Sequence, residues 1–294
     1  MSEQPADNFL GLSAAESDYE RARFAILPIP YDVTTTFLSG TRNGPRAILN
    51  ASRQVELFDE ELGAEFHGVG IATLSPVESD ARGPEYMNER IFRRARQAVR
   101  AGKFLIGLGG EHSVTSALVR AAMTKHRKLS VLQIDAHADL RNQYEGSEYS
   151  HASVMRRVHD LGAQIVPVGI RNWSLEEDKF MRKVGLKPIT ARQCFESDDW
   201  LDEALNRLGD KVYVTVDIDG FDPSFAPGTG TPEPGGLDWY QVTSLLHAVA
   251  EEKILVGADV VEVLPLPGQA VTEFLAARMA YKIICYAQLN DAAG

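Results

Sequence analysis

The 294-residue sequence contains few cysteines and no long apolar run. Its two cysteines, Cys194 and Cys285, lie far apart among apolar or aromatic neighbours. Two are too few for a disulfide scaffold, so we expect reduced thiols in the core.

The apolar segment 24–31 ends at Asp32, well short of the roughly 20 residues that span a bilayer. The first residues lack the basic patch and apolar run of a secretory signal. We therefore expect a cytoplasmic protein with no membrane partner.

Basic residues are outnumbered by acidic ones. Thirty lysines and arginines against 41 aspartates and glutamates give a net charge of −11. This charge repels a polyphosphate backbone, which argues against nucleic acid as the partner and is compatible with a small cationic ligand. With 44% hydrophobic and 24% charged residues, the composition is that of a globular protein and excludes disorder.

Apolar runs rich in Val, Ile and Leu alternate with amphipathic stretches, a rhythm typical of βαβ units. The runs predict strands at 24–28, 69–73, 104–108, 131–135, 165–169, 212–217 and 254–261. The amphipathic stretches predict helices at 86–101, 115–124, 175–184, 237–251 and 270–289. Several runs are apolar on both faces, as in a parallel sheet between helical layers. No linker or repeat divides the chain, so we expect one α/β domain over residues 1–294.

Histidines and aspartates lie at the carboxyl ends of three predicted strands. These residues are His112 after the third strand, Asp135, His137 and Asp139 after the fourth, and Asp217 and Asp219 after the sixth. If the chain stays extended there, alternate side chains share one face. Because parallel strands end at a common edge of the sheet, we expect the three groups to meet there.

Four carboxylates crowded together raise one another's pKa unless cations neutralise them. Their four negative charges match two divalent ions, and the two imidazoles complete the ligand shells. An oxygen-rich set with two imidazoles and no thiolate favours Mn²⁺ over Fe, Co, Ni or Zn. The sequence therefore predicts a site for two metal ions.

Competing motifs are incomplete. The segment after Asp217 is not a calcium loop, because Gly220 stands fourth instead of sixth and Gly228 occupies the place of the bidentate Glu. The glycines at 107–110 lack the last glycine of a dinucleotide fingerprint. No G-K-[ST], G-x-S-x-G or H-E-x-x-H motif occurs, which excludes nucleotide, serine-hydrolase and zincin readings.

Five sequence blocks resemble the ureohydrolase family, the arginases, agmatinases and relatives that hydrolyse guanidino groups to urea. The blocks are LSGTRNGPR (38–46), GGEHS (109–113), DAHAD (135–139), SHAS (150–153) and DIDGFDPSFAPGTGTPEPGG (217–236). The resemblance is greatest to agmatinases. It implies an arginase/deacetylase-like three-layer fold, with about eight parallel strands between helices on both faces. It also implies a homo-oligomer, a trimer or hexamer.

The resemblance implies a role for each site residue. One Mn²⁺ ion would be held by His112, Asp135, Asp139 and Asp217, and the second by Asp135, His137, Asp217 and Asp219. Two ions per subunit would share a water and generate the hydroxide that attacks the guanidinium carbon. His151 corresponds to the family's proton-transfer histidine, and Glu262 to its guanidinium-binding carboxylate.

The segment between Asp139 and His151 resembles that of agmatinases, and its Glu145 and Glu148 would suit a cationic amine tail. We therefore expect hydrolysis of agmatine to putrescine and urea, a step of polyamine biosynthesis. Residues 263–267 lack the polar groups that many family members carry after this glutamate. A guanidinobutyrase, an arginase or another guanidino-acid hydrolase therefore stays open.

Two functions outside the ureohydrolases are less well supported by the sequence. A deacetylase-like hydrolase would use a single Zn²⁺ with fewer aspartates. A non-catalytic, metal-stabilised binding protein would be expected to have lost a ligand, His151 or Glu262, and none is missing. The remaining histidines are expected to be structural; they are His67, His126, His159 and His247.

Overall fold

The computed structural model describes residues 7–289, and its centre is an eight-stranded parallel sheet. The strands are β1 (Phe24–Ile29), β4 (Ile71–Thr73), β5 (Phe104–Gly109), β6 (Ser130–Ile134), β7 (Gln164–Ile170), β8 (Ile189–Thr190), β9 (Lys211–Asp217) and β10 (Ile254–Val261). All seven predicted strands are confirmed. The two-residue edge strand β8 was not predicted from the residues, because it is too short to form an apolar run.

The five predicted helices are also present. They are α2 (Pro84–Arg100), α3 (Thr115–Met123), α5 (Leu175–Val184), α8 (Trp239–Glu252) and α9 (Val271–Tyr286). Four helices of six to nine residues were not predicted, namely α1 (Gly44–Ser52), α4 (Val154–Asp160), α6 (Ala191–Glu196) and α7 (Trp200–Arg207). The apolar faces of α4, α6 and α7 repeat too few times to stand out from the sequence. Helix α1 is as long as α3, but it begins with Gly44 and Pro45, which are typical of turns.

Two apolar cores lie on the two faces of the sheet. Helices α1, α6, α7, α8 and α9 pack on one face, and α2, α3, α4 and α5 on the other. Neighbouring residues of one strand enter different cores: Ile106 faces the first and Leu105 the second. This explains the strands' apolar residues on both faces. Cys194 and Cys285 are buried free thiols, as predicted. Between residues 7 and 289, no helix is long and apolar enough to cross a membrane.

The strand order places the predicted site residues together. The order is β4-β1-β5-β10-β9-β6-β7-β8, so β5, β10, β9 and β6 occupy the four central positions. His112 follows β5, Glu262 follows β10, Asp219 follows β9 and Asp135 follows β6. All pairings in this sheet are parallel, so these four strands end at the same edge. Ligand sites of open α/β sheets form at this edge, where the strand order changes direction.

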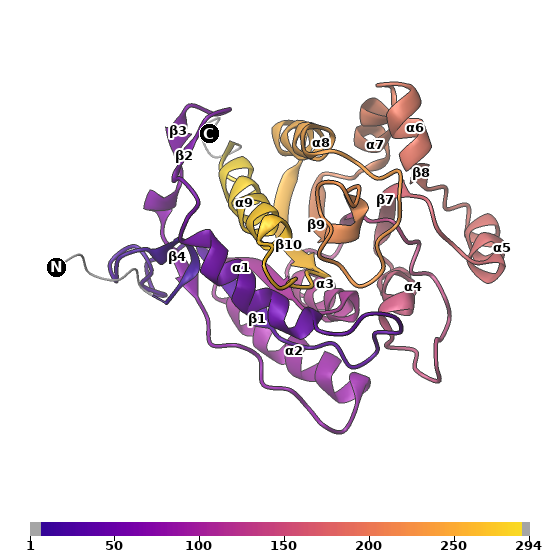
Figure 1. The fold of residues 1–294 in the computed structure, drawn as a ribbon, viewed down its shortest axis with the longest axis horizontal. Coiled ribbons are helices and arrows are strands. Elements are labelled where there is room, and N and C mark those ends of the chain that lie inside the picture. Colours follow the sequence, from indigo (N-terminus) through magenta and orange to yellow (C-terminus); the bar gives the residue numbers. More distant parts are fainter. Residues whose placement is uncertain (1–6, 290–294) are drawn as a thin grey trace.

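A small antiparallel hairpin, β2 (Phe58–Asp59) and β3 (Ala64–Glu65), lies beside the end of α9 (Figure 1). Lys282 of α9 joins the two, with its Nζ 2.9 Å from Asp59 Oδ1 and 2.7 Å from Glu61 Oε2. The side chains of Lys282 and Asp59 are both only 2% exposed. The hairpin is thus attached to the core through a buried ion pair.

Candidate metal centre and active site

His112 is the most deeply placed histidine of the site. The chain reaches it through Gly110, where a Cβ atom would lie only 2.0 Å from the carbonyl oxygen of Tyr31. The imidazole Nε2 lies 2.9 Å from Thr215 Oγ1, and the Thr215 hydroxyl donates to Asp259 Oδ1 at 2.6 Å. Since the single hydroxyl proton is donated to Asp259, Thr215 accepts the hydrogen bond from His112 Nε2–H. The other nitrogen, Nδ1, is then free to act as a ligand.

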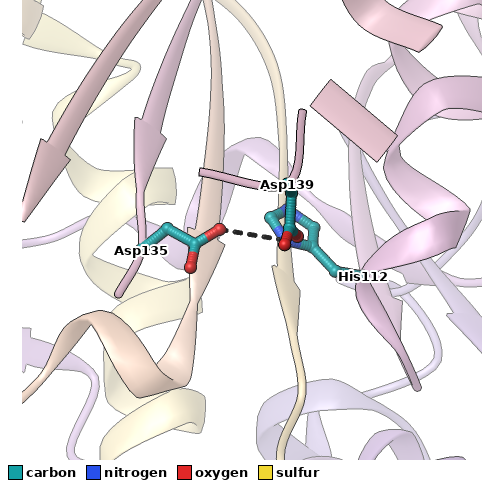
Figure 2. A group of neighbouring side chains, drawn as sticks. All are labelled: His112, Asp135 and Asp139. Atoms are coloured by element: carbon teal, nitrogen blue, oxygen red, sulfur yellow. Dashed lines mark ion pairs between the residues drawn. The ribbon is translucent and has the colours of Figure 1, made fainter. Parts of the chain in front are cut away.

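Three carboxylate oxygens surround this nitrogen (Figure 2 shows two of the aspartates). His112 Nδ1 lies 3.2 Å from Asp135 Oδ2, 3.2 Å from Asp139 Oδ2 and 3.3 Å from Asp217 Oδ2. Burial by itself lowers the pKa of His112, but the three carboxylates outweigh it and raise the pKa well above the ordinary value. A proton or a metal ion must therefore occupy the space between these acceptor atoms.

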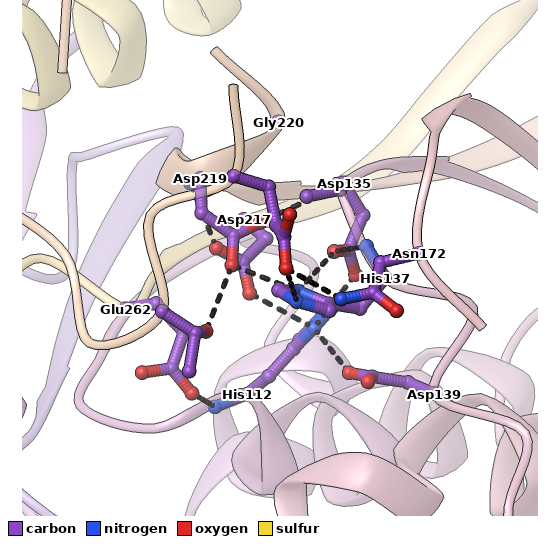
Figure 3. Close-up of polar contacts among 12 residues, drawn as sticks. His112, Asp135, His137, Asp139, Asn172, Asp217, Asp219, Gly220 and Glu262 are labelled. Carbon is purple, nitrogen blue, oxygen red and sulfur yellow. Dashed lines mark hydrogen bonds and ion pairs between the residues drawn. The ribbon is translucent and has the colours of Figure 1, made fainter. Parts of the chain in front are cut away.

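A second group forms beside the first and shares Asp135 with it (Figure 3). His137 Nδ1 lies 3.0 Å from Asp219 Oδ2 and 3.8 Å from Asp135 Oδ1. Asp135 thus directs Oδ2 toward the first group and Oδ1 toward the second. All six predicted ligands are gathered here, and their assignment as metal ligands stays a prediction.

Burial disfavours the ionised form of the carboxylates in this cluster. Burial and then the neighbouring Asp135 raise the pKa of Asp139 to about 7. Burial and the charge of Asp219 also raise the pKa values of Asp135 and Asp217. Burial opposes ionisation of Asp219 as well, but its contact with His137 outweighs this and lowers the pKa. Divalent cations would neutralise this group of carboxylates.

The chain does not stay extended through these motifs, which was the condition for alternate side chains to share one face. β6 ends at Ile134, and a single-turn 3₁₀ helix, Ile218–Gly220, follows β9. Asp135 Oδ1 accepts a hydrogen bond from the His137 N–H at 2.6 Å, and Asp217 Oδ1 accepts one from the Asp219 N–H at 2.9 Å. Aspartates favour such turns because the carboxylate can bond the backbone two residues on. Turns, not strand alternation, bring the side chains together.

Glu262 approaches the cluster from β10 in a left-handed backbone conformation, with φ of 62°. Its N–H donates to the Gly110 carbonyl at 2.7 Å, and its Oε1 accepts from the His112 N–H at 2.6 Å. Oε2 accepts no hydrogen bond from any described residue, which leaves it available to a ligand. Burial, followed by the nearby Glu111, raises the pKa of this carboxyl well above its ordinary value.

A cavity of about 170 Å³ opens above the cluster. Its lining includes His137, Asp139, Asp217 and Asp219, together with both predicted catalytic residues, His151 and Glu262. Burial, together with the charges of His137 and His112, lowers the pKa of His151 to about 4. His151 is therefore a neutral imidazole at physiological pH.

The rest of the cavity lining differs from the sequence-based expectation. Neither Glu145 nor Glu148 lines it, and Glu148 Oε2 instead pairs with Arg157 Nη1 at 3.1 Å. The lining also includes aromatic, polar and charged side chains that had not been predicted; they are Arg141, Tyr144, Asn172, Trp173, Ser174 and Glu177. Thr215 and Asp259 were also missed. For Asp259 a signal was available, because it is the one charged residue inside the apolar run 254–261.

Comparison with known proteins gives concordant matches. The Arginase family model matches residues 22–285. An N(1)-aminopropylagmatine ureohydrolase of Thermus thermophilus is 44% identical over 269 residues, 92% of each chain. One from Synechocystis is 39% identical over 281 residues, 93% of this chain and 92% of that one. The crystal structure of agmatine ureohydrolase of Thermoplasma volcanium has a TM-score of 0.87 at 30% identity, covering 99% of this chain and 98% of that one.

Proposed function

The chain belongs to the arginase family and is a ureohydrolase, and we propose that it uses two divalent metal ions to hydrolyse a cationic guanidino amine. The products are urea and the corresponding amine. One observation carries the proposal: two His/Asp groups share Asp135 beneath a cavity that Glu262 and His151 both line.

The chemistry of the ligand atoms fits two such ions. When His112 Nε2–H is directed at Thr215, Nδ1 carries no proton, so Nδ1 and the carboxylate oxygens around it can all act as ligands and none can donate a hydrogen bond. The oxygen-rich set without thiolate favours Mn²⁺. One ion would be held by His112, Asp135, Asp139 and Asp217, and the other by Asp135, His137, Asp217 and Asp219. When bound, a pair of this kind supplies hydroxide near neutral pH.

The protein's own residues then bind the substrate and move a proton. Oε2 of Glu262 can accept an N–H of the planar guanidinium, which holds the guanidinium carbon over the His/Asp cluster. His151 is neutral, so it can take up a proton at its imidazole and deliver it to the nitrogen that leaves. Protonation lets this nitrogen depart as an amine while the carbon is retained in urea.

Two substrates fit this chemistry. Agmatine would give putrescine and urea. N(1)-Aminopropylagmatine carries the same guanidino group on a longer polyamine and would give spermidine and urea. Identities of 39% and 44% to two relatives named for the longer compound favour it. Both reactions belong to polyamine biosynthesis.

A substrate panel tests the proposal. Urea release is measured for agmatine, N(1)-aminopropylagmatine, arginine and 4-guanidinobutyrate, with Mn²⁺-loaded and EDTA-treated protein in parallel. The acids belong in the panel because Arg141 lines the cavity and would suit a carboxylate. Faster, metal-dependent turnover of either amine supports the proposal, and faster turnover of an acid overturns the tail assignment.

We further propose that the enzyme acts in the cytoplasm as a homo-oligomer, a trimer or hexamer. Size-exclusion chromatography with light scattering tests the assembly, and a monomeric mass would contradict it.

A further inference from the structure

His151 contacts a threonine hydroxyl that is itself fixed by a buried carboxylate. Its Nδ1 lies 3.3 Å from Thr34 Oγ1, and its backbone N–H donates to the same oxygen at 3.0 Å. The Thr34 hydroxyl donates to Glu111 Oε1 at 2.8 Å. The three residues come from separate parts of the chain, so the fold brings them together.

Glu111 is held firmly enough to fix the direction of these hydrogen bonds. It is fully buried, and its own N–H donates to the Tyr31 carbonyl at 2.8 Å. Its Oε2 accepts the Thr34 N–H at 2.6 Å, and Ser113 Oγ donates to Oε1 at 2.5 Å. In its ionised form Glu111 therefore accepts from the Thr34 N–H, the Thr34 hydroxyl and the Ser113 hydroxyl.

The direction of the Thr34 hydroxyl determines the tautomer of His151. A threonine hydroxyl has one proton, and here it is donated to Glu111. The oxygen can then only accept from the ring, so Nδ1 carries the hydrogen. Ser150 Oγ, 3.4 Å from Nδ1, can rotate to accept as well. The other ring nitrogen, Nε2, receives no hydrogen bond from a described residue and keeps its lone pair.

We propose that Thr34, held by Glu111, is a positioning residue that fixes neutral His151 as the Nδ1–H tautomer and so assigns proton exchange with the substrate to Nε2. The catalytic consequence rests on the proposed ureohydrolase function. The tautomer itself does not. A histidine held in the wrong tautomer cannot take up a proton on the side where the reaction needs it.

The kinetic test compares Thr34→Val, Thr34→Ser and Thr35→Val, all Mn²⁺-loaded, with the best substrate of the panel. Thr34→Val should lower kcat about ten- to a hundredfold with KM changed less than about twofold, because positioning for proton transfer is lost and binding is not. Thr34→Ser keeps the hydroxyl and should recover kcat to within about threefold.

Thr35→Val is the matched control, since Thr35 is similarly half-buried and its hydroxyl bonds only the Asp32 carbonyl within the same loop. It should retain wild-type kcat. A Thr34→Val variant with wild-type kcat, or a Thr34→Ser variant as slow as Thr34→Val, would overturn the proposal.

A spectroscopic test decides the tautomer without activity. Ring ¹⁵N shifts of His151 are recorded at pH 8 on histidine-labelled protein loaded with diamagnetic Zn²⁺, with His151→Asn giving the assignment. A protonated Nδ1 and a bare Nε2 are expected, and the opposite pattern would refute the proposal. If the wild-type protein releases urea from no substrate, the proposed function fails, while these shifts still decide the tautomer.

Discussion

Two histidines of the site, His112 and His151, each contact a threonine hydroxyl whose proton is donated to a buried carboxylate. For His112 the partners are Thr215 and Asp259, and for His151 they are Thr34 and Glu111. In both cases the hydroxyl can only accept from the ring, so the structure selects one tautomer. A preset tautomer avoids reorganisation when a metal or substrate binds.

At this scale the membership of the His/Asp cluster was more predictable than its geometry, and the role of its members as metal ligands stays a prediction. All six His and Asp residues could be chosen from the sequence, because strand ends display them in short motifs. The left-handed backbone of Asp139 and Glu262, with φ of 52° and 62°, could not. Neither residue type requires that conformation, and only the surrounding tertiary contacts impose it.

Replacing Glu262 by Gln should lower kcat/KM for the guanidino substrate about ten- to a hundredfold. Glutamine keeps the shape but loses the charge-assisted hydrogen bond to the guanidinium, worth about 1.5–3 kcal/mol. Steady-state urea release measures the effect. The matched variant Glu148→Gln should behave as wild type, because Glu148 does not line the cavity and pairs with Arg157. A larger loss in Glu148→Gln would contradict this assignment.

Replacing Thr215 by Val should weaken Mn²⁺ binding about ten- to a hundredfold, because His112 loses the contact that orients its ring. Isothermal titration of Mn²⁺ into metal-free protein measures the change. Thr124→Val is the control, since this exposed residue caps the C-terminus of α3 and its hydroxyl bonds only the Ala121 carbonyl. Unchanged affinity in Thr215→Val would show that His112 needs no such support.

At the scale of elements, long apolar runs predict strands well because the residues on both faces of a buried strand are apolar. Short elements such as β8 and α6 depend on tertiary contacts and local caps. Helix α6, for example, begins with a capping box between Thr190 and Gln193. The attachment of the β2–β3 hairpin to α9 also had no local signal, because Lys282 and Asp59 lie 223 residues apart.

Replacing Lys282 by Ala should destabilise the fold by about 3–5 kcal/mol, because Asp59 is left as a buried, unpaired charge. Chemical denaturation followed by circular dichroism measures the free energy of unfolding. Lys282→Met together with Asp59→Leu should recover much of the loss, since no buried charge remains. The exposed control Lys128→Ala should change stability by less than about 0.5 kcal/mol. Equal losses of stability in Lys282→Ala and Lys128→Ala would refute the role of the buried pair.

At the scale of the whole molecule, metal binding and pH should be linked through the cluster. In the metal-free protein, burial lowers the pKa of His137, but Asp219 outweighs it and raises the pKa from 6.5 to about 11. This raised pKa contributes stability that is complete below pH 6.5 and is lost as the pH rises toward 11. The pKa of Asp139, raised from 3.8 to about 7, likewise makes stability fall as the pH rises through that range.

Metal-free protein should therefore lose thermal stability between pH 6 and pH 9. Divalent ions that replace these protons should reverse the loss, so the increase in Tm on adding Mn²⁺ should grow with pH. Thermal unfolding at pH 6, 7.5 and 9, with EDTA or with Mn²⁺, measures both trends. An Mn²⁺-induced increase in Tm as large at pH 6 as at pH 9 would argue against metal ions at this cluster.

The central claim is that this site hydrolyses the guanidino group of a cationic amine with the help of metal ions. Its most direct test is urea release from agmatine, N(1)-aminopropylagmatine, arginine and 4-guanidinobutyrate by Mn²⁺-loaded protein, with Asp135→Asn and EDTA-treated protein as controls. We expect urea from a guanidino amine, at a rate well above that from either acid, and its loss in both controls. Urea that persists after metal removal, or none from any of the four compounds, would contradict the account.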